Sequence, residues 1–193
     1  MSGTALQPSF DLVQELDRAI IATDDTTRCH RIKDALQVAV EAGAGLLAPR
    51  FLAPAVEGYA RRLLHRDPSG RYSVVVMVWD RGQGTALHDH AGRWCVECVY
   101  RGRVRVENFS RIADRDSTRE IWDFRSEGDL VTGVGDAGAL IPPFEYHRIS
   151  NPDKTPAVTI HVYGGEMDGC NVYEPAPNGG YHRVRKPLGY TPE

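Results

Sequence analysis

The sequence predicts a mainly β fold with helices at its N terminus, in the form of an antiparallel barrel or jelly roll. Residues 1–65 contain apolar residues at the three- and four-residue spacing of helices. From residue 66 onward, short apolar stretches alternate with turn residues at the spacing of about 8–12 residues that is typical of β-sandwiches and barrels. With 193 residues the chain suits a single domain. We therefore expect a mostly helical cap over 1–65 and a barrel with a C-terminal extension over 66–193.

Three helices are expected in the cap. The first covers residues 10–22, where the apolar residues share one face and Ser9 is placed to cap the helix. The second covers residues 27–42 and ends at two nearby glycines. The third is shorter, covers 51–64 and leads into the first strand.

The expected strands are rich in β-branched and aromatic residues and are bounded by turn residues. Residues 72–79 are almost all apolar, which indicates a buried strand. Residues 103–109 alternate between apolar and polar side chains. Further strands are expected over 118–124, 129–132, 137–141, 146–150 and 157–163.

Composition excludes several functional classes. The hydrophobic fraction of 41%, the charged fraction of 25% and the net charge of −3 give no electrostatic signature of a nucleic-acid or membrane partner. No signal segment and no long apolar span is evident, and the four cysteines follow no disulfide spacing. We therefore expect a cytoplasmic protein with reduced thiols, no nucleic-acid or membrane partner and no evident protein partner. The pair Cys95 and Cys98 lacks a second such pair to complete a zinc site.

Two histidines separated by one residue are the first sign of a metal site. His88 and His90 follow a glycine-rich turn, and in an extended segment both imidazoles would project from one face, about 7 Å apart at the backbone. That separation suits two ligands of one metal ion. A third histidine, His147, lies at the start of another expected strand.

Two stretches resemble the sequence motifs of the cupin superfamily. The first runs over 82–102 around His88 and His90, and the second runs over 142–151 around His147. The resemblance implies a cupin-type jelly-roll barrel with these three histidines as metal ligands.

The chain departs from the general cupin pattern at two positions. Phe144 stands where a glycine is usual, and Cys95 stands where many cupins place a glutamate ligand. Without that carboxylate the donors are three neutral imidazoles, so a bound Fe(II) would keep its full dipositive charge. Such a centre favours an anionic ligand, for which a thiolate is the obvious soft candidate.

Further motifs resemble the cysteine dioxygenase family, and the resemblance covers most of residues 55–175. The segment containing Tyr59 and Arg61 resembles the family segment that grips the substrate carboxylate. A guanidinium can hold a carboxylate through two parallel hydrogen bonds. The neighbouring Arg62 would point elsewhere, and we interpret it as structural or solvated.

The segment around residue 160 resembles the family's Ser-x-His-x-Tyr row. Thr159, His161 and Tyr163 alternate along one strand, so their side chains would share a face and form a hydrogen-bonded relay. The resemblance implies that the Tyr163 hydroxyl lies near the iron, that His161 orients Tyr163 and that Thr159 orients His161.

In some family members a cysteine is crosslinked to a tyrosine through a thioether, and the resemblance implies Tyr163 as that tyrosine here. Spacing from the second histidine favours Cys95 as the partner, although Cys98 lies nearby. Cys170 also matches a family cysteine at the rim of the site, without an implied catalytic role. Trp94 is expected to help line the cavity.

Together these resemblances imply a non-haem Fe(II) thiol dioxygenase that converts a small thiol carboxylate to a sulfinate, with L-cysteine as the first substrate candidate. The substrates are the thiol and O2, and the sequence carries no nucleotide-binding motif for an organic cofactor. The alternatives are 3-mercaptopropionate or mercaptosuccinate as the thiol. The family branch that prefers 3-mercaptopropionate is expected to have a neutral glutamine at the position of Arg61. Arg61 therefore favours a cysteine-type pocket, although a dicarboxylate thiol would also suit it. A non-catalytic metal-binding cupin and a zinc hydrolase are further alternatives, the second disfavoured because no carboxylate is evident as a general base beside the histidines.

Overall fold

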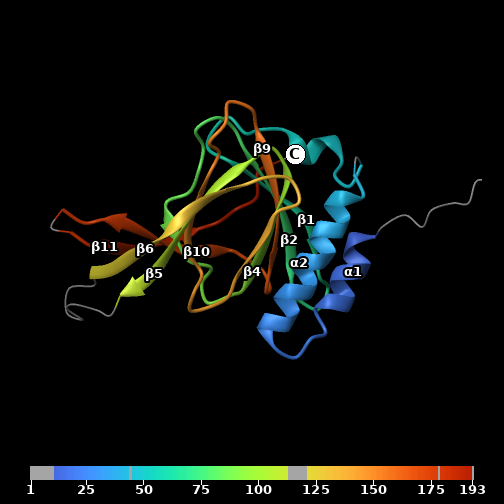
Figure 1. Cartoon of the computed structure of the whole chain (residues 1–193), viewed down its shortest axis with the longest axis horizontal. Coiled ribbons are helices and arrows are strands. Elements are labelled where there is room, and N and C mark those ends of the chain that lie inside the picture. The colour runs from blue at the N-terminus through green and yellow to red at the C-terminus, as the bar shows by residue number, and fades with distance from the viewer. Residues whose placement is uncertain (1–10, 44, 113–120, 178, 193) are drawn as a thin grey trace, which may run out of the picture.

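The computed structural model describes residues 11–43, 45–112, 121–177 and 179–192. Two antiparallel helices lie against one side of a β structure (Figure 1). The helical elements are α1 (Leu12–Ala19), α2 (Asp25–Glu41) and a short 3-10 turn, η1 (Pro49–Leu52). Helix α1 is capped by the Asp11 side chain, which accepts hydrogen bonds from the backbone of Val13 and Gln14. The expected cap, Ser9, lies outside the described residues.

The strands form two sheets. The first has the order β1-β2-β9-β4-β7, and the second has the order β10-β11-β6-β5-β8-β3 and closes because β3 pairs with both β8 and β10. This architecture confirms a mainly β, cupin-type fold with N-terminal helices. The bounds are β1 (Ala60–Arg66), β2 (Ser73–Trp79), β3 (Leu87–His88), β4 (Cys95–Arg101), β5 (Val104–Ile112), β6 (Ile121–Thr132), β7 (Ala137–Leu140), β8 (Tyr146–Ser150), β9 (Ala157–Tyr163), β10 (Gly169–Pro175) and β11 (Tyr181–Pro187).

The five-stranded sheet has two different faces. One face packs against α1 and α2 and is entirely apolar over β2 and β9. The opposite face points into the barrel and carries a second apolar cluster mixed with polar side chains. Strands buried on both faces read as continuous apolar runs, which explains residues 73–79.

The expected third helix over 51–64 is wrong. The chain makes only the η1 turn there and then enters strand β1 at Ala60, paired antiparallel with β2. The ladder to β2 and the burial of the first three β1 side chains outweigh the weak helical spacing. As a result, the adjacent residues Arg61 and Arg62 lie on opposite faces of a strand.

Several strand boundaries also differ from expectation. Strand β6 is one long strand rather than two, and residues 118–120 of the expected 118–124 strand lie outside the described part of the chain. Strands β4, β10 and β11 were not expected. No helix in the described ranges combines the length and apolarity needed to cross a bilayer.

Candidate metal centre

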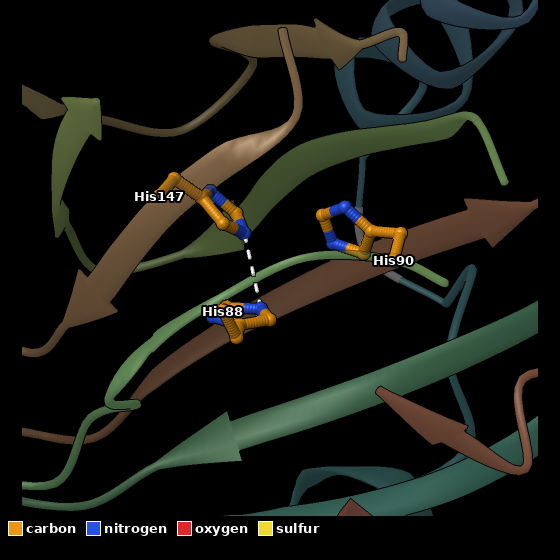
Figure 2. A group of neighbouring side chains, drawn as sticks. All are labelled: His88, His90 and His147. Atoms are coloured by element: carbon orange, nitrogen blue, oxygen red, sulfur yellow. Dashed lines mark hydrogen bonds between the residues drawn. The ribbon is translucent and has the colours of Figure 1, made fainter. Parts of the chain in front are cut away.

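Two of the three histidines lie on adjacent strands of the closed sheet, and the third follows directly after one of them. His88 ends β3 and its Cα pairs with that of His147 on β8, while His90 follows two residues later. Figure 2 shows the three rings converging on one point. Gly84 allows this approach, because a Cβ there would lie 2.7 Å from the carbonyl oxygen of Ile149.

Asp89, between the two histidines, anchors their segment to β10. One of its carboxylate oxygens accepts the backbone N–H of Asn171 at 2.9 Å, and the other accepts the Tyr173 hydroxyl at 3.0 Å. Asp89 is buried. It therefore fixes the direction in which the flanking imidazoles point, a role that the sequence interpretation missed.

The geometry of the rings suits a shared metal ion. Ring centroids are 5.3 Å apart for His88 and His90, 4.5 Å for His88 and His147, and 5.1 Å for His90 and His147. One nitrogen from each ring lies within 4.8 Å of the others. The Nε2 atoms of His88 and His147 are only 3.2 Å apart.

The three rings are held neutral, as metal ligands must be. Burial lowers the pKa of each, and neighbouring histidines lower the pKa of His90 and His147 further. The Nδ1–H of His88 donates to the Ala86 carbonyl at 3.0 Å, which leaves its Nε2 lone pair facing the cluster. The 3.2 Å contact is a hydrogen bond that the Nε2–H of His147 donates to this lone pair. A bound ion would replace that proton and accept a lone pair from each ring, so the donor set fits a divalent transition metal such as Fe(II).

A cavity of about 80 Å³ opens beside the histidines. The predicted residues Tyr59, Arg61, His161 and Tyr163 all line it, together with Cys170. The structure thus brings these predicted side chains to the same cavity as the three histidines.

Arg61 is held rigidly in the cavity wall. Only 4% of it is exposed, and its guanidinium donates to the carbonyl of Met167 at 2.7 Å and to that of Gly189 at 3.2 Å. The guanidinium also lies over the ring of Tyr190 at 4.7 Å. Its buried Nε has no partner among the described residues. Arg62, in contrast, donates to the Ala53 carbonyl on the other face of the strand.

Two aromatic residues extend the cavity wall. The ring of Tyr59 packs on that of Trp79 with centroids 4.6 Å apart, and burial raises the pKa of the Tyr59 phenol. Trp79 also donates its indole N–H to the Thr159 hydroxyl at 2.9 Å. The expectation that Trp94 lines the cavity is wrong, because Trp94 belongs to the core between the sheet and the helices.

The Thr159, His161 and Tyr163 side chains share the interior face of β9, as alternation predicted. The Thr159 hydroxyl lies 2.7 Å from Nε2 of His161. The rings of His161 and Tyr163 are stacked, with centroids 5.9 Å apart, and no hydrogen bond joins them in the described structure. The expected relay is therefore complete only between Thr159 and His161. Burial lowers the pKa of His161 to about 3.

Cys95 and Cys98 face opposite sides of β4. The Cα of Cys95 pairs with that of Tyr163 on β9, on the interior face. Cys98 belongs to the core beneath the helices. Of these two cysteines, only Cys95 lies on the same face as Tyr163, which makes it the geometrically suitable crosslinking partner.

Glu97 is a site residue that the sequence interpretation missed. It lies on the interior face of β4, with one carboxylate oxygen 4.0 Å from Nδ1 of His147 and the other 3.6 Å from Nδ1 of His161. Burial raises its pKa to about 7. The premise that no carboxylate lies beside the histidines is therefore wrong. Glu97 nevertheless faces the side of the His147 ring away from the ligand cluster, which does not suit a base acting on metal-bound water.

Comparison with known proteins agrees with this geometry. The family model described as "Cysteine dioxygenase type I" matches residues 47–176. Human cysteine dioxygenase type 1 is 23% identical over 117 residues, which cover 60% of this chain and 56% of the human protein. The zebrafish (Danio rerio) enzyme is 22% identical over 129 residues, covering 66% of this chain and 61% of that protein. The match thus spans little more than half the length of these relatives.

Solved structures resemble the chain more distantly. A Thermus thermophilus protein, TT1209, has a TM-score of 0.46 and 19% identity, covering 60% of this chain and 91% of that protein. An oxalate oxidase has the same TM-score and 19% identity, covering 67% of this chain and 65% of that one.

Proposed function

Because the chain belongs to the cysteine dioxygenase type I family, we propose that it is a non-haem iron dioxygenase that adds both atoms of O2 to the sulfur of a small thiol carboxylate. One observation carries the proposal furthest. Three neutral imidazoles converge without a carboxylate in the donor group, and a buried guanidinium lines the same cavity. This combination suits a substrate that brings both a thiolate and a carboxylate.

In this proposal His88, His90 and His147 hold Fe(II). The ion, when bound, supplies a centre at which a thiolate and dioxygen can meet and exchange electrons. The reaction RS⁻ + O2 → RSO2⁻ breaks the O–O bond and forms two S–O bonds. All the electrons that reduce dioxygen come from sulfur, so no external reductant is needed.

The surrounding residues position the substrate. Arg61 is the anchor for the carboxylate, since its guanidinium is fixed in advance by two backbone carbonyls and by Tyr190. Tyr59, packed on Trp79 beside it, contributes a phenol hydroxyl to the same end of the cavity. Preorganisation of this kind reduces the entropy lost when the thiol is bound.

The residues of β9 act near the sulfur. The Tyr163 hydroxyl is proposed to hydrogen-bond the reacting oxygen, with its ring held by stacking on His161. Thr159 holds His161 in turn through a 2.7 Å contact. A thioether between Cys95 and Tyr163, if formed, would fix the phenol more firmly.

L-Cysteine is the first candidate thiol, and Arg61 argues against a preference for 3-mercaptopropionate. A second candidate, a thiol dicarboxylate such as mercaptosuccinate, is favoured by Lys186. That lysine lines the same cavity from β11, opposite Cys170, and offers a second positive charge. We expect Lys186→Met to raise KM for mercaptosuccinate and to leave KM for cysteine unchanged if the dicarboxylate is the substrate.

Oxygen uptake by Fe(II)-loaded protein tests the proposal directly. Cysteine, mercaptosuccinate and 3-mercaptopropionate would be compared in parallel, with the carboxylate-free thiol cysteamine as a control. We expect thiol-dependent uptake with sulfinate as product and the lowest KM for a carboxylate thiol. Protein that binds metal but consumes oxygen with none of these thiols would support a non-catalytic metal-binding cupin instead.

We also propose a reducing compartment, the cytoplasm, as the location. Cys29, Cys95, Cys98 and Cys170 are all buried and free in the structure, and none is paired in a disulfide.

A further inference from the structure

Glu97 is a buried carboxylate for which the proposed reaction gives no role. Its Cα pairs with that of His161, and its side chain lies on the same interior face of β4 as Cys95. Only 8% of Glu97 is exposed, and its Oε2 has no hydrogen-bond partner among the described residues. A buried carboxylate without a partner is unfavourable. A proton donor or a positive charge is therefore expected to face it.

The nearest candidate donors belong to two histidine rings on different strands. Oε1 of Glu97 is 4.0 Å from Nδ1 of His147, and that Nδ1 is itself buried without a partner among the described residues. The opposite nitrogen of the same ring, Nε2, faces His88 at 3.2 Å. A ring that binds metal through Nε2 carries its proton on Nδ1 and needs an acceptor for it. Glu97 is suitably placed to be that acceptor.

The hydrogen bonds of Thr159 place a second proton opposite Glu97. The Thr159 Oγ1 accepts the indole N–H of Trp79 at 2.9 Å and lies 2.7 Å from Nε2 of His161. Because Thr159 Oγ1 already accepts from Trp79, we assign its hydroxyl hydrogen to His161 Nε2. With that assignment the proton of the neutral His161 ring lies on Nδ1, which is 3.6 Å from Oε2 of Glu97 and 3.9 Å from Sγ of Cys95.

We propose that Glu97 is a positioning residue that accepts the Nδ1–H of both His147 and His161. One carboxylate would then orient a ligand of the metal and the ring stacked on Tyr163. The inference rests on the proposed metal-binding role of the three histidines. Both distances exceed a good hydrogen bond by about 1 Å or less. Glu97 also lines a second cavity of about 210 Å³, so its side chain is not closely packed on every side.

Glu97 acts on the ligand ring and not as a ligand itself. Its oxygens are not part of the group of donor atoms that lie within 4.8 Å of one another, which in the described ranges consists of the three histidines. A carboxylate behind a ligating imidazole raises the basicity of the ring and fixes its orientation. The donor set has no carboxylate because Cys95 stands where many cupins have a glutamate ligand. Glu97 would supply part of that missing negative charge from behind the His147 ring.

Metal affinity measured with Fe(II) alone, under anaerobic conditions and in competition with a chelator, tests the proposal. Glu97→Leu removes both charge and acceptor, whereas Glu97→Gln keeps an acceptor oxygen and removes the charge. We expect Kd to rise about 10- to 100-fold in Glu97→Leu and by a smaller factor in Glu97→Gln. Glu145→Gln is the matched control, because Glu145 is also a buried carboxylate with an unpartnered Oε2 and does not line the cavity of the metal centre.

A second measurement separates positioning from simple structural support. The metal-free Glu97→Gln protein should unfold at the same denaturant concentration as wild type or at a higher one, because a buried charge has been removed. Unchanged Fe(II) affinity in Glu97→Leu, or in Glu97→Gln should the leucine variant not fold, would overturn the proposal. So would a weakened affinity that is equally large in Glu145→Gln. If wild type itself bound no Fe(II), the proposed function would fail first, and the two failures are thus distinguishable.

Discussion

The two faces of the five-stranded sheet are built from alternate residues of the same strands, yet they serve different ends. On β9 the side chains of Val158, Ile160 and Val162 pack beneath the helices. Between them, Thr159, His161 and Tyr163 point into the barrel, where His161 and Tyr163 line the cavity of the candidate metal centre. The same alternation on β4 directs Cys98 outward and Cys95 inward.

The contrast between these faces shows how a polar site can be held rigidly inside a small protein. The helix-facing side chains of β2 and β9 are almost completely buried and supply favourable apolar burial without polar groups. The interior face contains buried groups whose orientation depends on a few hydrogen bonds. We therefore expect substitutions on the helix-facing side to change stability, and substitutions on the interior side to change metal or thiol binding.

The largest effect is expected from removing a metal ligand. His147→Ala should lose stoichiometric Fe(II) and all thiol-dependent oxygen uptake, because two imidazoles cannot hold the ion as three do. Metal analysis of purified protein together with an oxygen electrode checks this. Retention of a full equivalent of iron would exclude His147 as a ligand.

On the helix-facing side, Ile160→Ala should lower the free energy of unfolding by about 2–5 kcal/mol, because it leaves a cavity in a fully buried core. Iron content per folded protein should stay at the wild-type level. Denaturant titration and metal analysis measure the two quantities. If iron were lost while stability changed little, the separation of the two faces would be refuted.

Arg61 and Arg62 form a matched pair across one strand. Arg61→Gln should raise KM for carboxylate thiols about 10- to 100-fold, since a hydrogen bond to a charged group contributes about 1.5–3 kcal/mol. KM for cysteamine should hardly change, and iron should remain bound. Arg62→Gln, on the opposite face, serves as the control and should leave KM for carboxylate thiols unaltered. If Arg61→Gln left the thiol kinetics unchanged, Arg61 would not be the residue that binds the substrate carboxylate.

The buried His161 predicts a pH dependence of the metal-free protein. Its pKa falls from 6.5 to about 3 on folding, so between these values the unfolded state binds a proton that the folded state does not. The free energy of unfolding should therefore fall as pH is lowered through this window, by up to about 1.4 kcal/mol per pH unit from this group. Urea titrations at about pH 7 and about pH 5 would show a smaller fall in His161→Gln than in wild type. Equal falls in the two proteins would contradict the assignment.

The smallest effect is expected at the two cysteines of β4. Cys95→Ser should abolish any thioether to Tyr163, so the protein that contains the crosslink would become undetectable by intact-mass and peptide mass spectrometry. Cys98→Ser should leave the crosslinked fraction unchanged, because Cys98 faces the helices. A crosslink that survived in Cys95→Ser would show that another residue is the partner.

The sequence predicted most of the fold because the strands are strongly patterned and bounded by turn residues. It failed over 51–64, where helical spacing in a short segment competed with a ladder to β2 that only the tertiary structure reveals. Trp94 was placed in the cavity wrongly, although it directly precedes Cys95 and alternation already implies the opposite face.

The sequence predicted those residues of the candidate site that lie within motifs of fixed spacing. His88, His90 and His147 converge as expected because each lies in a motif with fixed spacing. Glu97 was missed because the cupin motif places its carboxylate at position 95, whereas a residue two positions further along a strand shares the same face. Lys186 and Trp79 could not be found, since their place in the cavity depends on how distant strands pair.

The fate of isotopically labelled dioxygen, in the reaction of Fe(II)-loaded protein with L-cysteine and mercaptosuccinate, decides whether this protein is a thiol dioxygenase. We expect a sulfinate from at least one of these thiols in which both oxygen atoms carry the label, at one dioxygen consumed per thiol, and no product from His147→Ala. Disulfide formation without incorporated label, or iron-loaded protein that consumes no oxygen with either thiol, would contradict the proposed function.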